Sequence, residues 1–177
     1  NDGLRVAVLT GAGAKAFSAG ADLKTLLPAF RERIRRGDAG AQWNFGGGLA
    51  RGIEFTKPLI AAVNGHALAG GLEMALACDI RLCSSNATFS LAEAKWAVVP
   101  GAGGTQRLPR AIPMGMAMEM LFTGASIDAA TAYHFGLVNR VLAPEALLPD
   151  ALALAGRIAA AGPLAVRAIK RSVKDGL

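Results

Sequence analysis

The sequence predicts an α/β protein in which short buried strands alternate with helices. Apolar and β-branched runs at residues 4–10, 59–63 and 80–83 are typical of strands that are covered on both faces. Glycine-containing turns end the first two runs. Segments whose apolar residues recur at helical spacing separate the runs, and strands that alternate with helices indicate an α/β architecture.

Each expected element has a local reason. Over 23–36 the apolar positions recur every three or four residues, with a basic outer face. Glycine and polar residues dominate 37–52, which is typical of a long mobile connection. The elements expected as far as Cys83 are, in order, a strand over 4–10, a loop at 11–13, a helix over 23–36, the connection over 37–52, a strand over 59–63, a helix over 72–78 and a strand over 80–83.

The second half of the chain is expected to be mainly helical. Gly124 is a helix stop, Asp128 is a helix N-cap, and Pro144 and Pro163 each begin a helix. The expected elements are an extended segment over 87–91, a loop that carries Glu93 and the glycine cluster 100–104, helices over 114–122 and 128–135, a strand over 137–142 and two final helices. The length of 177 residues predicts a single domain over 1–177, with a core over 1–143 and a helical part over 144–177.

Composition excludes several classes of protein. With 53% hydrophobic and 18% charged residues, disorder is excluded as the main state. The net charge of +6 suits an anionic partner, but 6% aromatic residues and scattered basic residues argue against a surface that stacks bases, and we interpret the arginines at 31–36 as a solvated helix face. Cys78 and Cys83 are too few and too close for a zinc site or a disulfide framework, so we expect reduced core thiols and a cytoplasmic protein. No uncharged apolar stretch is long enough to span a membrane, so no membrane partner is expected.

Two familiar catalytic patterns fail. The segment 11–16 fits a dinucleotide fingerprint, but Phe17–Gly20 interrupts the helix that this fingerprint must open. A serine hydrolase is disfavoured because no G-x-S-x-G occurs, and the only histidines are His66 and His134.

Two other segments combine small residues with a turn into a helix, at 17–23 and 65–73. A helix start presents unpaired backbone N–H groups, and glycine or alanine lets a ligand oxygen approach them. Two such ends that face each other would form an oxyanion hole. From these residues alone, two ordinary tight turns explain the pattern equally well.

Four longer motifs follow one another along the chain: KAFSAGADL, KPLIAAVNGHALAGGLEMALACDIRL, ATFSLAEAKWAVVPGAGGTQRLPR and LFTGASIDAATAYHFGLVNRV. Together they resemble the enoyl-CoA hydratase/isomerase (crotonase) family over essentially all 177 residues. The resemblance implies a crotonase-like spiral of β-β-α units with C-terminal helices. It also implies an acyl-CoA thioester as substrate, no metal and no further cofactor, no specific nucleic acid, and a homotrimer or dimer of trimers in the full-length form. Family members are usually longer at both ends, so we expect this chain to be a fragment of a longer enzyme.

The resemblance also assigns binding residues. The backbone N–H groups of Ala21 and Gly70 would hold the thioester oxygen, the carbonyl of Ala19 would face the CoA adenine, and Lys24 would approach a phosphate. The substrate-binding set carried over from the family is Ala19, Asp22, Leu23, Lys24, Gly71, Pro100 and Gly101, with the loop that begins at Pro100 beside the acyl chain.

Two carboxylates match the family's hydratases. Glu73 lies three residues beyond Gly70, and Glu93 lies twenty residues after Glu73. Glu73 would be the base that orients water and Glu93 the acid, because two carboxyl groups in different protonation states can move both protons. Each has a plain alternative. Glu73 also suits the first turn of any helix, and Glu93 could pair with Lys95 or with a neighbouring arginine.

The predicted function is therefore the reversible syn hydration of a 2-trans-enoyl-CoA to a 3-hydroxyacyl-CoA. An isomerase that uses one dominant base is the alternative within the family, and the WNFGGG segment at 43–48 resembles hydratases of carnitine-derived (crotonobetainyl) enoyl-CoA. A non-catalytic RNA-binding protein is the alternative from another class.

Overall fold

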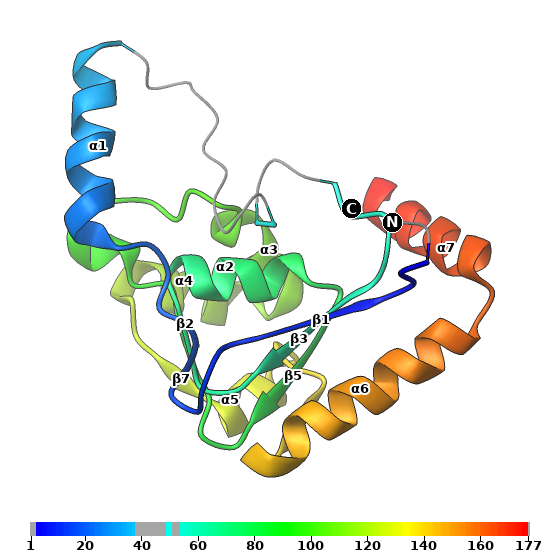
Figure 1. Cartoon of the computed structure of the whole chain (residues 1–177). Coiled ribbons are helices and arrows are strands. Elements are labelled where there is room, and N and C mark those ends of the chain that lie inside the picture. Colours follow the sequence, from blue (N-terminus) through cyan, green and yellow to red (C-terminus); the bar gives the residue numbers. More distant parts are fainter. Residues whose placement is uncertain (1–2, 38–48, 51–53, 177) are drawn as a thin grey trace.

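A computed structural model describes residues 3–37, 49–50 and 54–176, and it confirms the α/β prediction (Figure 1). The strands form two four-stranded sheets. The first sheet has the order β1-β3-β5-β8, and all its pairs are parallel. Its strands are β1 (Ala7–Thr10), β3 (Leu59–Val63), β5 (Ile80–Ser84) and β8 (Arg140–Leu142). The second sheet has the order β2-β4-β6-β7, with strands β2 (Ala16–Ser18), β4 (His66–Leu68), β6 (Thr88–Ser90) and β7 (Ile127–Asp128).

The chain builds these sheets by repetition. A strand of the first sheet is followed by a strand of the second, and then by a helix, in the sequences β1-β2-α1 and β3-β4-α2; β5 and β6 lead into a 3₁₀ helix and α3. Each repeat adds one strand to each sheet, which is the spiral of β-β-α units that the resemblance implied. The helices are α1 (Leu23–Arg35), α2 (Gly70–Ala77), the 3₁₀ helix η2 (Glu93–Trp96), α3 (Gly104–Ala111), α4 (Met114–Thr123), α5 (Ala129–His134), α6 (Pro144–Ala160) and α7 (Pro163–Asp175).

Strand β3 shows why its sequence is apolar throughout. Ala61 and Val63 belong to a core cluster that includes Leu72 of α2. The alternate residues Ile60 and Ala62 belong to a second cluster, which they share with apolar residues of α6. Because β3 is covered on both faces, period-two alternation is absent from its sequence. Figure 1 shows α6 running along the side of the β1, β3 and β5 strands that faces away from α2.

The helix boundaries follow the predicted signals. Asp128 caps α5, since its Oδ1 accepts a hydrogen bond of 2.8 Å from the N–H of Thr131. Gly124 ends α4 with φ 60°, the left-handed conformation that glycine adopts without strain. Pro144 and Pro163 occupy the first positions of α6 and α7.

Several expectations need correction. The first strand begins at Ala7 and not at residue 4, the last begins at Arg140 and not at 137, and Glu93 lies on a 3₁₀ helix and not in a loop. Strands β2 and β4 and helix α3 were not expected. The two strands have three residues each and helix α3 contains Pro109, so none carries a periodic pattern long enough to detect. Most of the connection expected over 37–52 falls at 38–48 and 51–52, outside the described residues, and so does the WNFGGG segment at 43–48.

Helix α7 has no buried residue and lies beside both ends of the chain in Figure 1. Lys170 attaches it to the end of the first sheet: its Nζ donates to Asp79 Oδ2 at 2.6 Å and to the carbonyl of Lys57 at 2.7 Å. In the part of the chain that the structure describes, no single helix has the length and apolar character to span a bilayer; α6 and α7 meet the test only as a pair, bent by 106°.

Candidate active site

The two turns that the sequence singled out lie against each other. A Cβ atom placed on Gly20 would come within 2.9 Å of the Gly70 amide nitrogen, and one placed on Gly70 would lie 3.9 Å from the amide nitrogen of Ala21. Gly20 has φ 85°, and a Cβ on Gly71 would meet the carbonyl oxygen of Ser18 at 2.0 Å. Glycine is therefore required here for the close approach of β2 and the start of α2.

The residue before α2 is held in a strained conformation. Ala69 has φ 50° and ψ −124°, a combination that L residues rarely adopt. Its N–H donates to the carbonyl of Ser90 at 2.8 Å, and its carbonyl accepts from the N–H of Glu73. These bonds fix the direction in which the first turn of α2 points its free N–H groups.

Glu73 lies one turn into α2 and is 2% exposed. Its Oε1 accepts two hydrogen bonds of 2.8 Å, from the N–H of Ala102 and from the N–H of Gly104. Both donors need a lone pair, so Oε1 is an unprotonated oxygen in this arrangement. The bonds also hold the side chain in one orientation, which a carboxylate chosen only for the helix dipole would not require.

Glu93 begins η2 and has a different environment. Burial is the main cause that raises its pKa, from 4.5 to about 7; a backbone hydrogen bond opposes the rise, and the negative charge of Glu73 adds to it. Its Oε2 is buried, and no group of the described residues forms a hydrogen bond with it. The alternative of an ion pair with Lys95 finds no support at this oxygen.

The first turn of α2 therefore brings together the four groups predicted from the sequence. It carries Gly70 and Glu73, and it packs on the Gly20–Ala21 turn. The negative charge of Glu73 also raises the pKa of Glu93. One of these carboxyl groups accepts hydrogen bonds, while the other has a pKa raised to about 7. Such a pair can remove a proton from one atom of a bound molecule and deliver a proton to another.

The remaining predicted residues fall into two groups. Asp22 acts as the cap of α1: its Oδ1 accepts from the N–H of Lys24 at 2.9 Å, and its carbonyl accepts from the N–H of Leu26. The residues Ala19, Lys24 and Gly101 are exposed, Leu23 and Pro100 are half-buried, and Gly71 is buried. No contact of the exposed residues tests their predicted roles toward CoA.

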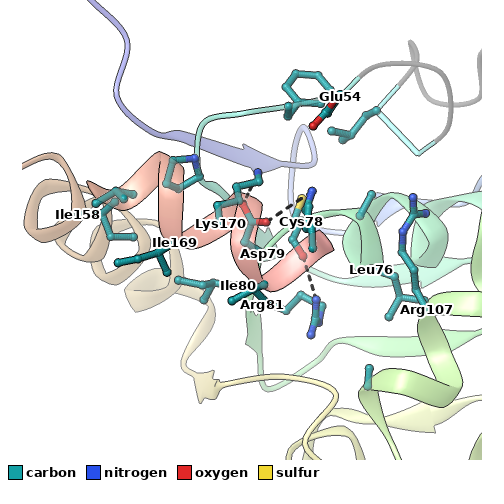
Figure 2. A pocket seen from close by; sticks show the side chains of 18 of the residues that line it. Glu54, Leu76, Cys78, Asp79, Ile80, Arg81, Arg107, Ile158, Ile169 and Lys170 are labelled. Carbon is teal, nitrogen blue, oxygen red and sulfur yellow. Dashed lines mark hydrogen bonds and ion pairs between the residues drawn. The ribbon is translucent and has the colours of Figure 1, made fainter. Parts of the chain in front are cut away.

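A large groove lies elsewhere in the molecule. Figure 2 shows it between the C-terminal end of α2, helices α3 and α7, and the end of α6, with a volume of about 1220 Å³. None of the predicted site residues lines it. Its walls include Cys78, whose thiol is buried and has a pKa raised to about 11, mainly by burial. Burial likewise raises the pKa of Cys83 to about 12, so both are unreactive core thiols at neutral pH.

Sequence reasoning missed the groups that hold Glu73. The amides of Ala102 and Gly104 are invisible as chemical signals because every residue except proline has an N–H. The run of small residues at 101–104 is the signal that could have indicated a close approach of this backbone to another group. In the structure, a Cβ on Gly104 would lie 3.1 Å from Glu73 Oε1. Among the described residues, no three His, Cys, Asp or Glu side chains gather as metal ligands.

The model of the family described as enoyl-CoA hydratase/isomerase matches residues 1–177. This chain belongs to that family. It is 45% identical over 171 residues to a crotonyl-CoA hydratase of Syntrophomonas wolfei and 45% identical over 167 residues to a carnitinyl-CoA dehydratase of Citrobacter koseri. These matches cover 96% and 94% of this chain, and 64% and 62% of the relatives.

A solved structure agrees with the family assignment. The enoyl-CoA hydratase of Mycobacterium tuberculosis superposes with a TM-score of 0.85 at 43% identity, over 99% of this chain and 66% of that one. The crotonase fold implied by the motifs is confirmed. The chain spans just under two thirds of the length of these relatives.

Proposed function

We propose that this member of the enoyl-CoA hydratase/isomerase family catalyses the reversible syn addition of water to a 2-trans-enoyl-CoA, giving a 3-hydroxyacyl-CoA. The observation that carries the proposal is the contrast between two neighbouring carboxyl groups. Glu73 accepts two amide hydrogen bonds at Oε1. Burial raises the pKa of Glu93 to about 7, and its buried Oε2 has no donor among the residues that the structure describes.

In the proposed reaction the thioester carbonyl oxygen binds the N–H groups of Ala21 and Gly70. Negative charge develops on this oxygen when a nucleophile attacks carbon 3, and each donor contributes about 3 kcal/mol to the stability of that state. Glu73 removes a proton from water as the oxygen of the water bonds to carbon 3. Glu93 then delivers its proton to carbon 2, which restores the thioester.

The environment of Glu93 favours hydration over isomerisation. An isomerase can move one proton between two carbons with a single base, so it has no need of a second carboxyl group with a raised pKa. Here burial and the charge of Glu73 both favour the protonated form of Glu93. The relatives named as a crotonyl-CoA hydratase and a carnitinyl-CoA dehydratase support the same chemistry, and they leave the acyl group to be identified by assay.

The test compares Glu93→Gln with the wild type. Gln retains the size of the side chain and removes the proton that can be transferred, so hydration of crotonyl-CoA should fall by about 10²- to 10⁴-fold. The readout is the loss of the enoyl thioester absorbance. If Glu93→Gln keeps most of a double-bond isomerisation activity toward a 3-enoyl-CoA, the isomerase alternative replaces this proposal. Crotonobetainyl-CoA, assayed beside crotonyl-CoA, tests the carnitine-derived substrate.

RNA binding makes a separate prediction. Binding to RNA would have a salt dependence that becomes weaker when the arginines at 31–36 are replaced, and it would not respond to Glu73→Gln. For the proposed hydratase, replacing the arginines at 31–36 should leave hydration unchanged, and Glu73→Gln should lower it.

A further inference from the structure

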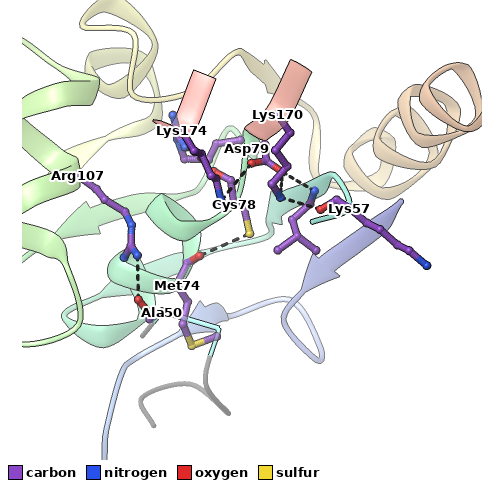
Figure 3. Close-up of polar contacts among 10 residues, drawn as sticks. Ala50, Lys57, Met74, Cys78, Asp79, Arg107, Lys170 and Lys174 are labelled. Atoms are coloured by element: carbon purple, nitrogen blue, oxygen red, sulfur yellow. Dashed lines mark hydrogen bonds and ion pairs between the residues drawn. The ribbon is translucent and has the colours of Figure 1, made fainter. Parts of the chain in front are cut away.

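The side chain of Arg107, on α3, lies behind the loop that holds Glu73. Its Nη1 donates to the carbonyl of Ala102 at 2.8 Å, and its Nη2 donates to the carbonyl of Ala50 at 2.9 Å. Figure 3 shows the guanidinium reaching from α3 to Ala50. Ala102 and Ala50 are both fully or almost fully buried, so each carbonyl would lose its charged donor in a protein without Arg107.

Ala102 is therefore fixed through both of its backbone groups. Its N–H donates to Glu73 Oε1, and its carbonyl accepts from Arg107. The next residue, Gly103, has φ 104°, and a Cβ placed on it would come within 2.3 Å of Arg107 Nη1. The guanidinium thus packs directly on the turn that aims the Ala102 and Gly104 amides at the same carboxylate oxygen. A rotation of this turn would separate the two donors from Oε1.

The Arg107 guanidinium is half-buried. Burial lowers its pKa, and the negative charge of Glu73 opposes this change. The guanidinium and the Glu73 carboxylate therefore lie near enough to interact.

We propose that Arg107 is a positioning residue for the proton transfer at Glu73: it fixes the Ala102–Gly104 turn, whose amides hold the Glu73 carboxylate. This inference rests on the proposed function for its kinetic consequence, but its geometric part is independent of any activity. The chemistry assigned to Arg107 includes no contact with substrate.

The test uses three variants of the chain. Arg107→Met keeps the length and apolar volume of the side chain and removes both the donors and the charge. Arg107→Lys restores the charge and one donor. Arg110→Met is the matched control, because Arg110 lies on the same helix and on the same groove, is exposed, and donates to Gln106 on its own helix.

Arg107→Met should lower kcat for enoyl-CoA hydration by about tenfold to a hundredfold, with KM changed by less than about threefold, the behaviour expected when a catalytic group is misplaced. Arg107→Lys should give a kcat between those of Arg107→Met and the wild type. Arg110→Met should leave kcat and KM unchanged. An unchanged kcat in Arg107→Met would overturn the proposal, as would an equal fall of kcat in Arg107→Met and Arg110→Met.

A second readout does not depend on turnover. Amide hydrogen exchange of Ala102 and Gly104 should become at least about tenfold faster in Arg107→Met and should not change in Arg110→Met. Faster exchange in a chain that hydrates no enoyl-CoA would support the geometric role and reject the proposed function. Unchanged exchange would reject the role of Arg107 whether or not the wild type is active.

Discussion

The two carboxyl groups of the candidate active site lie in opposite kinds of surroundings. Glu73 is almost fully buried on a helix, and two backbone amides of a distant loop hold one of its oxygens. Glu93 is half-buried on a short 3₁₀ helix, and its buried Oε2 has no donor among the described residues. Burial raises the pKa of Glu93 to about 7. The two carboxyl groups therefore differ in hydrogen bonding as well as in burial.

Gly104→Ala should have the largest effect of the substitutions considered next, because it displaces the Glu73 carboxylate from the amides that hold it. The added Cβ would lie 3.1 Å from Glu73 Oε1 and 2.9 Å from Leu91 Cδ1, and Leu91 is fully buried. We expect kcat for enoyl-CoA hydration to fall by about tenfold or more, and the free energy of unfolding to fall by about 1 to 3 kcal/mol. Steady-state kinetics and urea unfolding measure the two effects.

Gly156→Ala is the matched control for this glycine substitution. Gly156 lies inside α6, and nothing lies within 4 Å of its added Cβ. The free energy of unfolding should rise by up to about 1 kcal/mol from helix propensity, with activity unchanged. Equal losses of activity in both variants would show that the activity responds to glycine replacement in general and not to the position of Glu73.

The pH dependence of the stability of Glu93→Gln tests the environment of Glu93. The pKa of Glu93 is about 7 in the folded protein against 4.5 for the free group, so between these values the folded state holds a proton that the unfolded state has lost. Stability from this group is complete at low pH and is lost as the pH rises through about 7. As the pH rises to about 7, the free energy of unfolding of Glu93→Gln should therefore increase relative to that of the wild type. The expected increase is on the order of 1 kcal/mol, a value reduced for solvent screening.

Thermal unfolding at several pH values provides the measurement. The wild type and Glu93→Gln should separate progressively between about pH 4.5 and 7, with the variant more stable on the alkaline side. A constant difference in melting temperature across this interval would mean that Glu93 titrates alike in the folded and unfolded states.

The smallest expected effect belongs to Ala69→Gly. The conformation of Ala69, with φ 50° and ψ −124°, suits glycine, so relief of strain outweighs the added flexibility of the unfolded chain. Stability should rise by up to about 1 kcal/mol, measured by urea unfolding, with little change in KM. A loss of stability would mean that the Ala69 methyl group makes a packing contribution larger than the strain.

The sequence predicted the longer elements well for a physical reason. The strand over 59–63 and the helix that begins at residue 23 have enough residues to display burial on both faces or a 3.6-residue period. Strands β2 and β4 are too short for either pattern, and they exist because neighbouring strands pair with them. Their stability comes from tertiary contacts that a local pattern does not contain.

The same limit applies to the candidate site. Glu73 and Glu93 could be selected as residues, since a carboxyl group is a distinct chemical type. Their different environments could not be predicted, because these depend on the amides of Ala102 and Gly104 and on the burial of Oε2. The role of Arg107 could not be predicted for the same reason. Its partners are backbone carbonyls, and every residue of a sequence has one.

The most direct test of the account is a titration of the glutamate side-chain carboxyl carbons by NMR, in the wild type and in Glu73→Gln. The account predicts that the Glu93 signal titrates at about pH 7 in the wild type and at lower pH in Glu73→Gln, where the neighbouring negative charge is gone. A Glu93 signal that titrates near 4.5 in both proteins would contradict it, because Glu93 would then be ionised at neutral pH and could not deliver the proton.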